Sequence, residues 1–156
     1  MENSSTFELT FSDIKEIKNF CANLYSEPCY REVIEEVSGG STDFEVSNVR
    51  FITDDVILSV MTEEIFEDDY ILGCFNASFI ASNSNLPIEM IEACQETEAF
   101  EAIGKALNAT LSQDEKDSFC ESYAALDGYG HHFNDYDFNE EEIIINGILY
   151  HVFDNH

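Results

Sequence analysis

Positive charge is scarce in this sequence. Its 156 residues include only 6 lysines and arginines against 33 aspartates and glutamates, so the formal net charge is −27. Proteins that bind nucleic acid need clustered Lys and Arg side chains to displace the counterions of the phosphates. The six cations here are too few and too scattered for that purpose: Lys15, Lys18, Arg31, Arg50, Lys105 and Lys116. We therefore expect no direct binding to nucleic acid and none to an anionic membrane.

Other absences exclude further classes of protein. No stretch approaches the roughly 20 apolar residues of a membrane span, and the first ten residues lack the basic and apolar segments of a signal peptide. The five cysteines form no CxxC pair, which predicts reduced thiols and a cytoplasmic location. No G-x-S-x-G, P-loop or G-x-G-x-x-G motif selects a catalytic site, so we predict neither an enzyme nor a cofactor.

The chain nevertheless contains enough apolar residues to fold. It is 44% hydrophobic, with 13 Phe and 7 Tyr but only 2 Pro and 7 Gly. High charge produces disorder only where hydrophobicity is low, and a chain of this length can bury about 70% of its unfolded surface. No internal repeat or flexible linker divides the sequence. Residues 1–156 are therefore predicted to form one acidic domain.

Hydrophobic periodicity predicts several helices. Apolar residues recur at helical spacing over residues 12–24, 30–37, 87–107 and 112–126. The last of these helices opens with a capping box, in which Ser112 and Glu115 each bind the backbone N–H of the other.

Strands are predicted where apolar residues alternate or run together. These segments are 44–46, 49–51, 56–61, 70–80, 142–145 and 148–153. The last two segments flank Asn146-Gly147, which favours a type I′ hairpin turn because both central residues of that turn need positive φ. We therefore predict an α+β fold, with helices packed on a small, mostly antiparallel sheet that ends in a C-terminal β-hairpin.

The acidic residues are concentrated in stretches without any cation. Twelve acids lie between Phe51 and Gly104 and nine follow Lys116, with no Lys or Arg in either stretch. Solvated faces usually mix Lys with Glu and gain ion pairs, so we interpret these acids as a surface that binds a basic partner. The residues predicted to contact it are Glu63, Glu64, Glu67, Asp68, Asp69, Asp135, Asp137, Glu140, Glu141 and Glu142.

The spacing of some acids suggests what they imitate. Carboxylates three or four residues apart on a helix, such as Glu89, Glu92 and Glu96, have Cβ atoms about 5–6 Å apart, comparable with successive phosphates of a DNA strand. In size and charge the chain resembles the DNA-mimic inhibitors that phages and plasmids use against restriction and CRISPR systems. That resemblance implies a non-catalytic inhibitor of a nuclease or CRISPR effector. A twofold dimer would lengthen its acidic surface, and the sequence leaves dimerisation open.

Two alternatives to DNA mimicry remain. One is an acidic immunity protein that covers a basic face unrelated to DNA, for example on a toxin. The other is a metal-assisted hydrolase, in which His131, His132, Asp135 and Asp137 hold the ion.

Two further observations concern the residues around the predicted hairpin. Asp135-x-Asp137-x-Asn139 matches the first three ligand positions of a calcium loop, but Glu140 stands where an EF-hand needs glycine. His151 alternates with the apolar residues on either side of it, and we therefore predict that it faces solvent.

Overall fold

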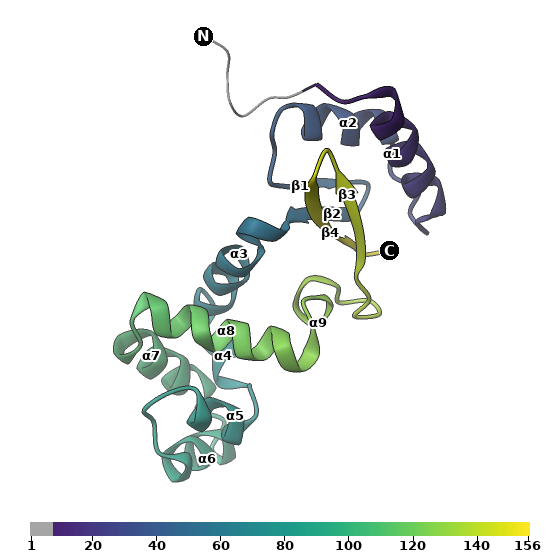
Figure 1. Ribbon diagram of the computed structural model, residues 1–156. Coiled ribbons are helices and arrows are strands. Elements are labelled where there is room, and N and C mark those ends of the chain that lie inside the picture. Colours follow the sequence, from purple (N-terminus) through teal and green to yellow (C-terminus); the bar gives the residue numbers. More distant parts are fainter. Residues whose placement is uncertain (1–7) are drawn as a thin grey trace. The chain divides into compact units, whose positions relative to one another are not determined.

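The structure is a computed structural model, in which residues 8–156 are described (Figure 1). The chain divides into two compact units. Of the described residues, the sheet unit comprises 8–57 together with Gly128–His156, and the helical unit comprises Leu58–Asp127. Helices and an antiparallel sheet are both present, so the predicted α+β class is confirmed. The expectation that residues 1–156 form one domain stays a prediction.

A four-stranded antiparallel sheet with the order β1-β2-β4-β3 forms the centre of the sheet unit. Its strands are β1 (Asp43–Val46), β2 (Val49–Thr53), β3 (Glu141–Ile145) and β4 (Ile148–Asp154). Asn146 and Gly147 have φ values of 51° and 79°, as a type I′ turn requires. The predicted C-terminal hairpin is therefore confirmed.

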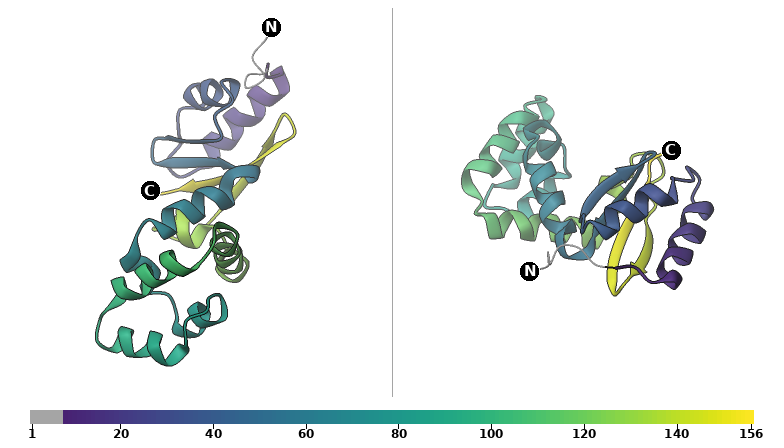
Figure 2. Two further views of the ribbon diagram at one scale, coloured as in Figure 1. Left: turned by 90° about the vertical axis from the view of Figure 1, so that its left-hand side faces the viewer. Right: turned by 90° about the horizontal axis from the view of Figure 1, so that it is seen from above.

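Helices α1 (Phe11–Asn23) and α2 (Tyr30–Ser38) pack on one face of this sheet (Figures 1 and 2). Thr10 and Asp13 form a capping box at the start of α1. Alternate strand residues point toward the two helices, as the pleat requires. The core between them contains Ile17, Cys21, Leu24, Val33, Val37, Phe44, Val46, Val49, Phe51, Ile143, Ile145, Tyr150 and Val152.

The short helix α9 (Gly130–Phe133) covers the opposite face of the sheet. The Phe133 ring lies 5.1 Å from the Phe153 ring, and the Arg50 guanidinium lies 5.0 Å from the centre of the Phe133 ring. Gly130 is required here because a Cβ at this position would lie only 2.1 Å from the carbonyl oxygen of Phe138. The α9 backbone and the following loop are thus in close contact.

The helical unit is built from six helices, of which α3 begins in the sheet unit. They are α3 (Asp54–Phe66), α4 (Asp69–Gly73), α5 (Ala77–Ser82), α6 (Ile88–Glu96), α7 (Phe100–Thr110) and α8 (Gln113–Asp127). The predicted capping box is present at the start of α8, with Ser112 N–H donating to Glu115 at 2.8 Å and Glu115 N–H donating to Ser112 Oγ at 3.2 Å. Among residues 8–156, no helix combines the length and apolar character that a membrane span needs.

The strand predicted over residues 56–61 is wrong, because this stretch belongs to α3. Its buried side chains Ile57, Met61 and Ile65 are four residues apart, which is a helical period. Asp54 lies in the first turn, where its negative charge favours the positive end of the helix dipole. The short run of β-branched residues in 56–61 obscured this longer periodicity.

The strand predicted over residues 70–80 is also wrong, because the stretch forms α4 and α5. Asp68 and Asn76 are the N-caps of α4 and α5, and each side chain accepts hydrogen bonds from the N–H groups of the second and third residues of its helix. Gly73 lies where α4 crosses α7. A Cβ on Gly73 would come within 1.9 Å of the Phe100 carbonyl oxygen.

Gly104 is the residue of α7 that allows α4 and α7 to cross closely. A Cβ on Gly104 would lie 2.1 Å from the carbonyl oxygen of Asp69.

We predict that Gly104→Ala lowers the free energy of unfolding by about 1–3 kcal/mol, because the new Cβ overpacks the crossing. Urea unfolding measures this change. The control is Gly39→Ala, where φ is −78° and the new Cβ would lie 3.4 Å from Glu35 O, so stability should change by less than about 1 kcal/mol. Equal effects of the two substitutions would contradict the close α4–α7 crossing.

Candidate functional site

The ten acids predicted to contact a partner fall into two groups, one in each unit. The helical-unit cluster lies at the end of α3 and the start of α4 and consists of Glu63, Glu64, Glu67, Asp68 and Asp69. The hairpin cluster lies in the loop after α9 and in β3 and consists of Asp135, Asp137, Glu140, Glu141 and Glu142.

Two acids of the helical-unit cluster stabilise the fold. Asp68 accepts hydrogen bonds of 3.1 Å from the N–H groups of Tyr70 and Ile71 in α4, and Asp69 accepts one of 3.0 Å from the Asn108 side chain. Glu63 lies on α3 and Glu67 directly follows its last residue; both are exposed, and the Glu67 N–H donates to the Glu63 carbonyl oxygen at 3.1 Å. Like charges four residues apart repel each other, and neither side chain caps a helix.

The hairpin cluster also contains acids with different roles. Asp137 accepts hydrogen bonds from the Asn134 side chain at 2.7 Å and from the Asn139 N–H at 3.0 Å. Asn134 is buried and holds this loop together. Asp135 and Glu141 are exposed. Glu141 lies on the α1–α2 face of the sheet, since it pairs with Val152.

His151 is buried, with 5% of its surface exposed, so the prediction that it faces solvent is wrong. Its Nδ1 lies 2.6 Å from Glu140 Oε2 and 3.7 Å from Glu142 Oε2, and its Nε2 lies 2.8 Å from Asp54 Oδ1. The Tyr129 ring packs edge-on against the imidazole at 5.3 Å. The alternation in β4 was interpreted correctly, but this face of the sheet is covered.

These carboxylates change the protonation of His151. The hydrogen bond that the ring donates to Glu140 has the largest effect and, with the one donated to Asp54, raises the pKa of His151 to about 9 against the opposing effect of burial. The ring is therefore an imidazolium at neutral pH, and both of its N–H groups donate to carboxylates. The sequence interpretation missed the pairing of Asp54 with His151, because 97 residues separate them.

We predict that His151 makes stability depend on pH. Its folded pKa of about 9 lies above the unfolded value of about 6.5, so its contribution is complete below about pH 6.5 and is lost as pH rises through 9. The expected loss is at most on the order of 3 kcal/mol. Between about pH 6.5 and 8, below the range where the buried Cys21 and Cys120 thiols contribute, urea unfolding should show stability falling with pH in the wild type and in Glu141→Gln, and a nearly flat profile in His151→Gln. A wild-type slope that survives in His151→Gln would contradict the assignment.

The residues expected to hold a metal for hydrolysis do not gather in the described part of the chain. The His131 ring stacks on Phe138 at 4.6 Å, and the Asp137 carboxylate is engaged by its own loop. Within residues 8–156, the one group of side chains with metal-ligand spacing is Glu140, Glu142 and His151, whose ligand atoms lie within 4.8 Å of one another.

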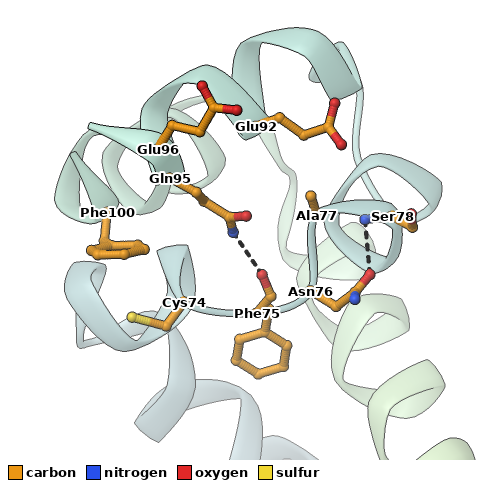
Figure 3. Close-up of a pocket in the computed structure, with 9 residues that line it drawn as sticks. All are labelled: Cys74, Phe75, Asn76, Ala77, Ser78, Glu92, Gln95, Glu96 and Phe100. Carbon is orange, nitrogen blue, oxygen red and sulfur yellow. Dashed lines mark hydrogen bonds between the residues drawn. The ribbon is translucent and has the colours of Figure 1, made fainter. Parts of the chain in front are cut away.

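Two of the three acids of α6, Glu92 and Glu96, line a pocket of about 530 Å³ in the helical unit. Glu89, Glu92 and Glu96 are all exposed on this helix. Figure 3 shows Glu92 and Glu96 beside Gln95, whose amide donates to the carbonyl oxygen of Phe75 at 2.8 Å. The pocket is thus lined on its α6 side by two free carboxylates and a fixed amide.

The cysteines provide no activated nucleophile at the two core positions. All five are free thiols, of which Cys21 and Cys120 are buried. Burial raises the pKa of both thiols to about 11. The thiolate needed for nucleophilic attack is therefore scarce at neutral pH.

Comparisons of this chain with protein-family models, with curated proteins and with solved structures find no match. A functional interpretation therefore depends on the chain's own surface and on the His151 cluster, which consists of His151 with Asp54, Glu140 and Glu142.

Proposed function

We propose that this protein is a cytoplasmic, non-catalytic inhibitor that presents its carboxylates as DNA phosphates to a basic DNA-binding protein. A restriction nuclease or a CRISPR effector is the expected class of target. The observation that carries this proposal is the excess of acids in both units. Leu58–Asp127 contains 15 acids and 2 lysines, and the rest of the chain contains 18 acids and 4 cations.

Ion pairing within the chain can neutralise only a small part of this charge. If each of the 6 Lys and Arg and the 4 His residues paired with one of the 33 acids, more than twenty carboxylates would remain. Solubility of a small domain requires only about 2–8 net charges. The excess raises self-repulsion in the folded state, and a basic partner would relieve that repulsion.

The helices offer carboxylates at regular intervals. The α6 acids occupy neighbouring positions on one helix face, at the 5–6 Å spacing between Cβ atoms that i, i+3 and i+4 positions have. On α8, Asp114, Glu115 and Glu121 are exposed as well. Lys and Arg side chains that normally contact DNA phosphates would find a fixed row of anions here. Their binding should be strongly salt-dependent, as DNA binding is.

The first test is capture of partners from a bacterial lysate at two salt concentrations, with an unrelated protein of similar acidity as control. We expect selective retention of a DNA-binding nuclease or CRISPR component, and its release by duplex DNA. Retention of a basic protein that DNA does not displace would instead indicate an immunity-type binder. Retention no different from that of the control protein would contradict the proposal.

Charge-neutralising substitutions locate the contact on the captured target. Glu63→Gln with Glu67→Gln, and Asp135→Asn with Glu141→Gln, each remove two charges that do not hold a cap, a turn or His151. At about 0.2–1 kcal/mol for each exposed pair, each double variant at the contact should weaken binding about 2- to 30-fold. The slope of log affinity against log salt should fall by as much as about 2.

The matched control for these variants is Glu16→Gln with Glu32→Gln. Both residues are exposed on helices that also carry Lys15, Lys18 and Arg31, so their charge is partly compensated. This variant loses the same net charge, and we expect its affinity to stay near that of the wild type. Equal affinity of all three double variants would exclude both clusters as the contact.

A further inference from the structure

We infer that Glu140, Glu142 and His151 form a binding site for one divalent transition-metal ion, with Zn²⁺ as the ion that fits best. Their three ligand atoms lie within 4.8 Å of one another. They come from the residue before β3, from β3 itself and from β4. This inference does not rest on the proposed function.

The sheet register brings two of the ligands together. Glu142 is the direct cross-strand partner of His151 in the β3–β4 hairpin, so both side chains emerge on the same face of the sheet. Glu140 approaches the same ring nitrogen, Nδ1, from the loop that leads into β3. Two carboxylates therefore converge on one nitrogen, although a single N–H needs only one acceptor.

The buried imidazole has the orientation of a metal ligand. The His151 side chain is 6% exposed, and its other nitrogen, Nε2, lies 2.8 Å from Asp54. Histidines that bind metal usually donate their second N–H to a carboxylate in this way, which fixes the ring and increases its basicity. Asp54 lies outside the group of three ligands and belongs to α3. It would therefore serve as a positioning residue.

The distances require only small movements. Four-coordinate zinc with ligands at about 2.0–2.1 Å separates its ligand atoms by about 3.3 Å. The distance from Nδ1 to Glu140 Oε2 would lengthen from 2.6 Å, and that to Glu142 Oε2 would shorten from 3.7 Å. The Glu142 side chain is 55% exposed and is free to make this adjustment. Water would complete the tetrahedron.

Charge and donor type select the class of ion. Asp54, Glu140 and Glu142 surround one imidazolium, which leaves two negative charges without compensation among these four groups. A divalent ion would take the place of the Nδ1 proton, which leaves to solvent, and would reduce this excess to one. One imidazole nitrogen with two carboxylate oxygens suits Zn²⁺ better than Ca²⁺, which prefers oxygen ligands alone.

The test is calorimetric titration of Zn²⁺ into the full chain at a salt concentration that suppresses diffuse binding to a polyanion. We expect the wild type and Glu141→Gln to bind one equivalent, and Glu142→Gln to bind at least ten-fold more weakly. Glu141 is the matched control, because it precedes Glu142 in β3 but lies on the other face of the sheet. Asp54→Asn should lower affinity by about 10- to 100-fold.

The imidazole signals of the four histidines provide a readout that does not depend on the variants folding. With less than one equivalent of Zn²⁺, the nuclear magnetic resonance signals of the His151 ring should change first. Equal Zn²⁺ affinity of wild type and Glu142→Gln, or changes at other histidines while His151 is unaffected, would overturn the site. Because these measurements use the isolated protein, neither result bears on partner binding.

Discussion

Mutual repulsion among carboxylates is the constraint on which the rest of this structure depends. Each unit carries an excess of acids over cations, and repulsion among them favours expanded states over a compact one. The fold survives because its cores are apolar and because some acids accept hydrogen bonds. Asp13 and Asp68 bind the free N–H groups at helix starts, and Asp43 forms a two-hydrogen-bond ion pair with Arg50. The hydrogen bonds and the ion pair of these acids offset part of the free-energy cost of the repulsion.

The energetic cost of charge also has to be offset at His151, inside the sheet unit. A buried charge is tolerated only when it is paired and hydrogen-bonded, and the imidazolium meets both conditions through Glu140 and Asp54. The positive charge of the ring in turn allows the carboxylates of Glu140 and Asp54 to lie against a covered face of the sheet. The hairpin and the first turn of α3 are thus joined by a cluster of charged side chains around His151.

The sequence predicted the features that local chemistry determines. Asn146-Gly147 requires a type I′ turn, and Ser112 with Glu115 forms a capping box, and both were recognised. Residues 56–61 and 70–80 were misassigned because short apolar runs have no clear period. The helical period of α3 becomes clear only when Ile65 is included, and the α4–α7 packing contact is not encoded locally. Gly73 is an example, since only the approach of α7 explains it.

The candidate sites also differ in whether they could be predicted from the sequence. The acidic clusters could be, because runs of Asp and Glu are read directly from the residues. The His151 cluster could not, because the partnership with Asp54 spans 97 residues and depends on which helix covers the sheet. Alternation alone placed His151 on the correct face but could not show that α9 and α3 approach that face. Burial of a polar residue is a tertiary property, and no local pattern in β4 encodes it.

The metal site and the acidic surface are linked through charge. Glu140 and Glu142 belong both to the hairpin cluster and to the three ligands around Nδ1. A bound divalent ion would weaken the negative field that a basic partner senses there, and a partner's arginine beside Glu142 would compete for the same carboxylate. Thermodynamic linkage makes these effects reciprocal. A partner that binds only the helical-unit cluster would leave metal affinity unchanged, so the size of the coupling would show which cluster forms the contact.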